Sequence, residues 1–484
     1  MFPRLILAMP CFMILTGCIN PMGISEPHPG IAVPERWTAS EKTSAGETAR
    51  EKTAPEGAIT EPGPRMAPSA GNAPPADPAL SWLLDFDDAA LRALVLEATK
   101  KNFRIGIALA RVKAARVRAE QKGAEKLPEV TANLGAARAR SGLTGSVSNT
   151  FDLGMDISFD LDLWNRLDNA AKAALAEAKA EEADYRMTRL SLAADVANAW
   201  LDAIEREQQL RLADKTIRSF ETSLSSILRQ YRLGIGSALD VRLARENVAT
   251  ARARRESRAR DRDTAARALE VLLGRYPAGA LPIQRDLPAL RREIPAGLPS
   301  DLLHRRPDLI AAKAKLLARG YDLAAAKANR LPGIRLTASG GTASDELGNL
   351  LRLDSLAWSI LGGLTQPIWD AGRLSGDVEI ANADRRQAAA EYAQAALQAF
   401  RQVESALMGE TLLANQETAL AIAAREARAA TVLAMEQYQR GLADIVTLLS
   451  SQRREFDAES ALLSIRKERL RRRVDLYLAL GGGF

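Results

Sequence analysis

Two stretches of the chain, residues 165–232 and 370–440, contain no proline and are rich in alanine, leucine, arginine and glutamate. Because proline interrupts an α-helix, each stretch can form one continuous helix. At 1.5 Å per residue such a helix is roughly 100 Å long, far longer than the helices of compact globular domains. The sequence therefore predicts long rods instead of a set of compact domains.

The composition is typical of long helices that pack closely through small side chains. Hydrophobic residues make up 47% of the chain and aromatic residues only 5%, so alanine and leucine supply most of the packing surface. The net charge is +6, and positive and negative residues alternate along the helices, as between Arg252 and Asp263. Such alternation indicates solvated helix faces. No basic block is interleaved with aromatic residues, so nucleic acid is not a predicted partner.

The chain after residue 80 contains the same order of landmarks twice. Each copy has a Leu-Pro pair, a tryptophan before the long helix, a tyrosine shortly before a glycine at its end, and a closing Leu-Gly pair. The pairs are Leu127-Pro128 and Leu331-Pro332, Trp164 and Trp369, Tyr231-Gly234 and Tyr438-Gly441, and Leu273-Gly274 and Leu480-Gly481. This order predicts an internal duplication, with repeats at 81–297 and 298–484.

Each repeat also contains two shorter helical stretches. They are residues 102–126 and 236–274 in the first copy, and 307–330 and 442–480 in the second. The two short helices together nearly match the length of the long one. We therefore expect them to stack end to end beside it.

Four segments between the helices alternate apolar and polar residues with the period of a β-strand. They are residues 129–140, 151–163, 333–343 and 356–368. Strands of this length with one apolar face suit a transmembrane β-barrel, although a soluble sandwich would alternate too. Four strands cannot close a barrel around a lumen, and an open edge is not viable in lipid. Three chains that contribute four strands each would close a barrel of twelve.

One strand face carries a row of carboxylates, which favours a water-filled lumen over a sandwich core. The residues predicted to face this lumen are Asp152, Asp156, Asp160, Asp162 and Arg335. Rings of like charge bias ion entry, so we expect a mild preference for cations.

Three arginines are expected to offset part of the lumen's negative field. They are Arg138 and Arg140, which follow one another on the first predicted strand, and Arg335.

Residues able to carry out chemistry are scarce in this chain. The histidines are His28 and His304, and the cysteines are Cys11 and Cys18. No disulfide framework, zinc site or cysteine–histidine pair can be built from this inventory. The sequence predicts neither an enzyme nor a bound cofactor.

The N-terminus has the features of an export signal. Residues 1–17 contain one basic residue followed by a short apolar stretch, too short to span a membrane. The ending Leu15-Thr16-Gly17-Cys18 resembles the lipobox of bacterial lipoproteins, which implies a covalent lipid on Cys18. The alternative is an ordinary signal peptide, with Cys18 incidental. Residues 18–80, rich in proline, glycine and small polar residues, predict a flexible tether.

Several motifs resemble the TolC-type outer-membrane efflux proteins, in particular their lipoprotein branch. Residues 298–309, LPSDLLHRRPDL, resemble the family's hallmark segment. Residues 159–164, 366–373 and 477–484 resemble its two strand-to-helix transitions and its C-terminus. In the hallmark, Pro307 fits the first turn of a helix.

This resemblance implies a fold, a location and partners. The expected fold is mainly helical, with a long periplasmic tube, an equatorial belt and a twelve-stranded outer-membrane barrel shared by a homotrimer. The expected partners are a periplasmic adaptor and an inner-membrane pump of the resistance-nodulation-division type. The protein would be a lipid-anchored outer-membrane channel that passively conducts small molecules such as drugs to the exterior.

The resemblance also implies a gate at the two periplasmic helix turns, 231–245 and 438–453. The candidate gate residues are Tyr231, Asp240, Tyr438, Asp444 and Leu449. Leu449 could form an apolar ring, while the two aspartates could bond to tyrosines of a neighbouring hairpin. The alternative is that these residues only cap helices and form turns.

Two other functions remain open at this stage. The first is a duct for protein secretion through an ABC-type pump. The second is a coiled-coil lipoprotein without a pore, which accounts for the helices but not for the paired strands at matched points.

Overall fold

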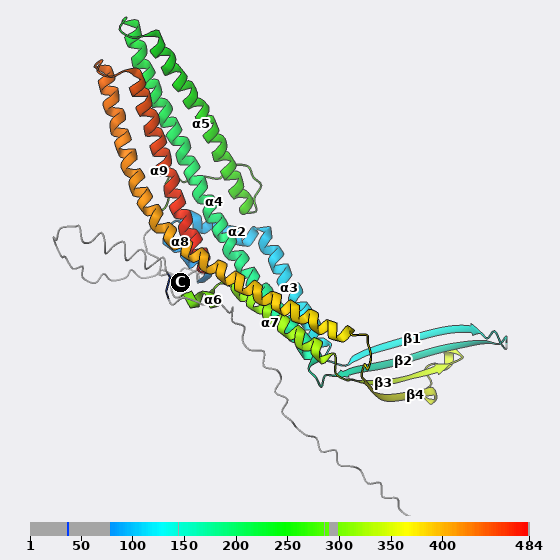
Figure 1. Ribbon diagram of the computed structural model, residues 1–484. Coiled ribbons are helices and arrows are strands. Elements are labelled where there is room, and N and C mark those ends of the chain that lie inside the picture. The colour runs from blue at the N-terminus through cyan, green and yellow to red at the C-terminus, as the bar shows by residue number, and fades with distance from the viewer. Residues whose placement is uncertain (1–35, 38–77, 144, 285, 290–298, 483–484) are drawn as a thin grey trace, which may run out of the picture.

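The protein is elongated, with a small β-sheet at one end and two helical turns at the other (Figure 1). This computed structural model describes residues 36–37, 78–143, 145–284, 286–289 and 299–482. The helices between the two ends pack alongside one another over most of the length (Figure 1). Any site on the sheet is therefore far from any site on the helical turns.

The two repeats have helices of equal length. The long helices α4 (Arg166–Arg232) and α8 (Arg373–Gln439) have 67 residues each. The helices that follow them, α5 (Ala238–Leu272) and α9 (Ile445–Ala479), have 35 residues each. Both long helices begin and end within three residues of the predicted positions. Among the described residues, no helix combines the length and the hydrophobicity needed to cross a bilayer.

Short helices stack in pairs along each long helix, as predicted. Helices α3 (Phe103–Ala124) and α5 both pack along α4, while α7 (Pro307–Ala328) and α9 both pack along α8. Pro307 is the first residue of α7, where its missing N–H is tolerated. Helix α4 also contacts α7 and α9, so it joins the two repeats.

The first repeat begins with two elements that the periodicity did not predict. They are the 3₁₀ helix η1 (Pro78–Phe86) and helix α2 (Ala89–Lys101). Asp88 begins α2 by accepting a hydrogen bond from the backbone N–H of Leu91, and it also accepts one from the indole of Trp200, at 2.8 Å. The buried carboxylate thus fixes α2 against the middle of α4.

Part of the predicted tether, residues 18–80, is packed against the helices, which corrects that prediction. Trp37 is only 3% exposed and belongs to a buried cluster on α8, where its ring centroid lies 6.2 Å from that of Phe400. The tether's last residues already belong to η1. The average hydrophobicity of the stretch is low and does not reveal a single large aromatic side chain. One tryptophan can nevertheless bury a large apolar surface, as Trp37 does against α8.

The sheet is antiparallel, with strand order β1-β2-β3-β4. Its strands are β1 (Glu129–Arg140), β2 (Val147–Leu161), β3 (Gly333–Ser344) and β4 (Leu356–Thr365). Consecutive strands pair, so β1 and β4 are the two edges. Compared with the prediction, β2 begins and ends earlier, and β4 ends at Thr365 and not at residue 368.

Candidate functional site

The sheet has one polar and one apolar face, as the alternation predicts. Strand register places Asp152 beside Gly135 and Ala343, and Asp156 beside Thr131 and Ser339. Asp160 and Arg335 are cross-strand neighbours on the same face, and the guanidinium donates to the carboxylate at 2.6 Å. The three aspartates and Arg335 therefore share one face of the sheet.

The opposite face is formed by exposed aliphatic and aromatic side chains. Its exposed members include Val130, Leu134, Leu153, Met155, Ile157, Leu336, Leu356, Trp358, Ile360 and Leu364. Exposed apolar side chains this numerous on one face indicate a surface that meets lipid or another apolar partner.

Asp162 is not part of the polar face, which corrects its predicted role. Strand β2 ends at Leu161, and the Asp162 carboxylate accepts hydrogen bonds from the backbone N–H groups of Leu167 and Asp168 at 3.1 and 2.8 Å. In the first turn of α4 these N–H groups have no backbone partner within the helix. Asp162 therefore stabilises the start of α4.

Arg138 and Arg140 also lie elsewhere than predicted. In β1 they continue the row of Val130 and Leu134, opposite Asn149 and Val147 of β2. This row belongs to the apolar face. The two arginines therefore cannot offset the field of the aspartates from within the same face, whereas Arg335 does.

At the other end of the molecule, both helical turns use a glycine in the left-handed region. Gly234 has φ +76° and Gly441 has φ +73°. The next helix then begins with a side-chain cap in each copy. Ser237 and Asp240 form a reciprocal capping box at α5, and Asp444 accepts from the backbone N–H of Thr447 at 2.7 Å at α9.

Asp240 and Asp444 are thus engaged with their own helices in this structure. Hydrogen bonds from the side chain and the backbone N–H of Thr447 hold the pKa of Asp444 below its usual value. Asp444 is therefore ionised at neutral pH and complements the positive end of the α9 dipole. This is the capping role that the sequence left as an alternative to gating.

Side chains from all four helices meet just behind the turns, in what we call the tip cluster. Its buried members are Ile227, Val241, Ala244, Ala434, Tyr438, Ile445, Leu448 and Leu449. Burial raises the pKa of Tyr438, and the charge of the nearby Asp240 adds to this effect. The tip cluster therefore joins the α4–α5 hairpin to the α8–α9 hairpin.

The tip cluster changes the interpretation of two predicted gate residues. Leu449 is 4% exposed and packs inside a single chain, so it does not project as an apolar ring in this conformation. Tyr438 is buried in the same cluster, whereas Tyr231, at the end of α4, is half exposed. The structure thus brings Tyr438, Asp240 and Leu449 together but leaves Tyr231 at the surface.

Two exposed aliphatic residues at the turns were missed by the sequence reasoning. Ile235 and Leu442 directly follow the turn glycines and are 75% and 74% exposed. Both residues occupy the same position in their repeats, directly after the turn glycine, and this correspondence could have identified them from the sequence. Apolar side chains presented at the end of a rod are suited to contact a partner.

Behind the tip cluster, helices α4 and α9 meet through buried polar side chains. Gln452 donates to the hydroxyls of Ser219 and Ser223 at 2.9 and 2.8 Å. Farther along, the side chains of Gln209 and Ser460 share a hydrogen bond at 2.9 Å. Buried polar contacts of this kind favour one register of the two helices, and period-based reasoning cannot identify them.

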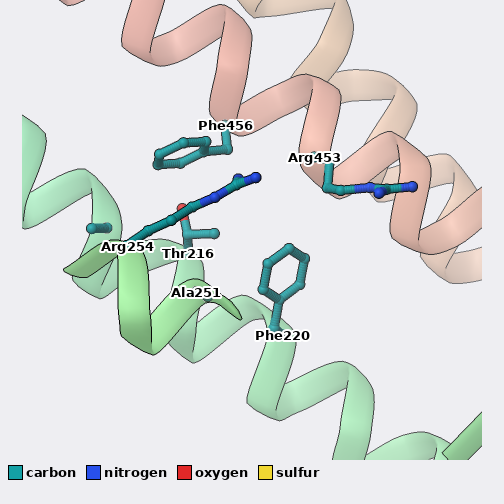
Figure 2. A pocket seen from close by; sticks show the side chains of 7 residues that line it. Thr216, Phe220, Ala251, Arg254, Arg453 and Phe456 are labelled. Carbon is teal, nitrogen blue, oxygen red and sulfur yellow. The ribbon is translucent and has the colours of Figure 1, made fainter. Parts of the chain in front are cut away.

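Figure 2 shows a small cavity between α4, α5 and α9. The guanidinium of Arg254 lies over the ring of Phe456, 5.8 Å from its centroid (Figure 2). Phe220 and Thr216 line the other sides. This arrangement is a cation–π contact between helices and holds no nucleophile with an adjacent base. Across the residues that the structure describes, no three His, Cys, Asp or Glu side chains form a possible metal site.

Comparison with known proteins identifies the fold and the family. The family described as outer membrane efflux protein matches residues 94–275 and 298–482. Toluene efflux pump outer membrane protein TtgF of Pseudomonas putida is 34% identical over 415 residues, which is 84% of this chain and 86% of that protein. The two matched segments correspond to the two structural repeats.

Solved structures agree with this assignment. A membrane protein from Pseudomonas aeruginosa has a TM-score of 0.80 and 34% identity, covering 86% of this chain and all of the other. The outer-membrane channel OprN has a TM-score of 0.79 and 27% identity, covering 88% of this chain and 99% of the other. The predicted fold class, a mainly helical chain with strands for a transmembrane barrel, is confirmed. The chain belongs to the outer membrane efflux protein family.

Proposed function

We propose that three copies of this chain assemble into an outer-membrane channel that passively conducts small molecules from the periplasm to the exterior. The observation that carries the proposal is the two-faced sheet with unpaired edges β1 and β4. In lipid, unpaired backbone groups at these edges must find partners. A neighbouring chain's edge supplies them, and the aspartate face then lines water while the apolar face meets lipid.

The proposed partners are a periplasmic adaptor and an inner-membrane pump. Relatives are named as outer-membrane components of efflux pumps, which supports a role within a larger assembly. The exposed Ile235 and Leu442 at the ends of the helical turns offer the adaptor an apolar surface far from the membrane sheet. For substrates we propose small apolar organic compounds, because the relative TtgF is named for toluene efflux. The channel itself carries out no chemical reaction.

Conductance in planar bilayers tests the proposal. The purified full chain should form discrete channels, and its mass in detergent should be that of a trimer. A folded trimer that never conducts would instead support the coiled-coil lipoprotein without a pore. Export of a protein substrate, with no effect of deletion on resistance to organic compounds, would support the secretion duct.

The proposed lumen should prefer cations because Asp152 and Asp156 recur three times around it. Replacing both by asparagine should reduce the preference, whereas Asp160 matters less because Arg335 already pairs with it. Reversal potentials in a salt gradient measure the change. As a control, Asp377→Asn alters an exposed helix carboxylate paired with Arg373 and should leave the potential unchanged. An anion preference in the wild type would contradict the assignment of the polar face.

We further propose that Cys18, which lies outside the described residues, is acylated and anchors the protein to the outer membrane. Cys18→Ser should abolish labelling by a radioactive or clickable fatty acid and reduce the amount recovered with outer membranes. Cys11→Ser, within the predicted signal peptide, is the matched control and should label normally. Unchanged labelling of Cys18→Ser would reject the lipid anchor but not the channel.

A further inference from the structure

The apolar face of strand β1 ends in two arginines. Along one row of this strand, Val130 and Leu134 are followed by Arg138 and Arg140 at the end away from the helices. The strand opposite offers Asn149, whose amide is also polar, as the neighbour of Arg138. The cations therefore lie on the same face as the apolar band and directly beyond it.

The hairpin that carries these arginines is purely basic. No aspartate or glutamate occurs from Val130 to Thr150. Residues of β2 before Phe151 pair only with β1, so this part of the hairpin extends beyond β3. Both arginines are exposed there. The connection between β3 and β4 differs, because its Arg352 lies 3.9 Å from Asp354.

The spacing places the arginines near one edge of a membrane barrel's apolar band. Arg138 lies about 26 Å along the strand from Val130, at roughly 3.3 Å per residue. With the usual tilt of about 40° this corresponds to about 20 Å across the bilayer, whereas the apolar band of an outer-membrane barrel is about 25 Å tall. Arg138 therefore lies in the last few ångströms of the band, and Arg140 lies closer still to its edge. A charged side chain is unfavourable in the middle of this band but is tolerated at its edge, where it can reach the headgroups.

From this placement we infer that Arg138 and Arg140 bind the phosphate groups of lipids in the outer leaflet. A guanidinium donates two parallel hydrogen bonds to a phosphate and keeps its charge when it is partly desolvated. Threefold assembly repeats the pair around the barrel, so each hairpin would hold lipid against the apolar face. The inference rests on the proposed channel, in which this face meets lipid.

Lipid binding to the purified full-length trimer in detergent tests the inference. The probes are diphosphorylated lipid A, the same lipid with both phosphates removed, and inorganic phosphate, with bound lipid counted by native mass spectrometry. The wild type should bind the phosphorylated lipid more tightly than the dephosphorylated one. Because each arginine near a charged membrane surface contributes about fivefold in affinity, the double variant R138Q/R140Q should lose about 25-fold. R138K/R140K, which keeps the charge, should retain most of it.

The matched control is R352Q, which removes an exposed arginine from the other loop and should bind lipid as the wild type does. Equal binding of the two lipids by the wild type, an equal loss in R352Q, or full competition by inorganic phosphate would overturn the inference. Conductance is measured on the same samples. A wild type that does not conduct would reject the proposed channel, whereas a conducting wild type that binds the two lipids equally would overturn only the inference about lipid binding.

Discussion

Replacing Leu448 by alanine should widen the channel at the end formed by the helical turns. Leu448 is completely buried in the tip cluster, where α9 meets α4 and α5. Removing a buried leucine side chain typically destabilises packing by about 2–5 kcal/mol, and a trimer carries the change three times. Because the cluster joins the two hairpins of a chain, we expect them to separate more readily. Single-channel conductance and sensitivity to large antibiotics should both rise.

An exposed leucine at the same end provides the control. Leu442 is 74% exposed, so Leu442→Ala removes almost no packing within the chain and should leave conductance unchanged. If Leu442 contacts the adaptor, this variant should instead reduce efflux when the partners are present. If Leu448→Ala formed a stable trimer with wild-type conductance, the tip cluster would not be what limits the width of the channel.

Glu410→Ala should strongly destabilise the middle of the helical tube. Glu410 of α8 forms an ion pair with Arg473 of α9, whose side chain is only 6% exposed. Removing one partner of a buried ion pair typically costs about 3–5 kcal/mol, because the remaining charge stays desolvated after it loses the carboxylate that faced it. The free energy of unfolding should fall by this amount, which thermal or denaturant unfolding in detergent would detect.

A second glutamate on the same helix separates this effect from a loss of surface charge. Glu436 pairs with Arg440 near the end of α8, and both side chains are exposed. Glu436→Ala should change the free energy of unfolding by only about 0.2–0.5 kcal/mol. If the two variants lost similar amounts of unfolding free energy, the Glu410–Arg473 pair would stabilise the protein no more than an exposed ion pair does.

The long helices could be predicted closely from sequence because their signals are local. The absence of proline and the repeated landmarks bound α4 and α8, and neither signal depends on tertiary contacts. Strand β2 was less well bounded. The apolar–polar alternation runs on through Asp162 and Leu163, although the chain has already left the sheet. Alternation describes side chains, whereas a strand ends where its hydrogen-bonding partner ends.

The site at the helical turns could be predicted only in part. Ser237 and Asp240 have the spacing of a capping box, so their capping role was open to prediction. The burial of Leu448 and Leu449 was not, because it depends on four helices from both repeats meeting at one point. Trp37 was missed for a similar reason, since its partners on α8 are distant in sequence.

The equal helix lengths in the two repeats restrict how the molecule can change its reach. One inserted residue lengthens a helix by 1.5 Å and rotates everything beyond it by about 100°, which would turn the buried face of α4 or α9 outward. Only insertions close to a whole number of turns, such as seven or eleven residues, keep the seams in register, and they keep the two turns level only when made at the same level in α4, α5, α8 and α9. The helical part of the molecule can therefore lengthen only in steps of two or more turns, roughly 10 Å at the least.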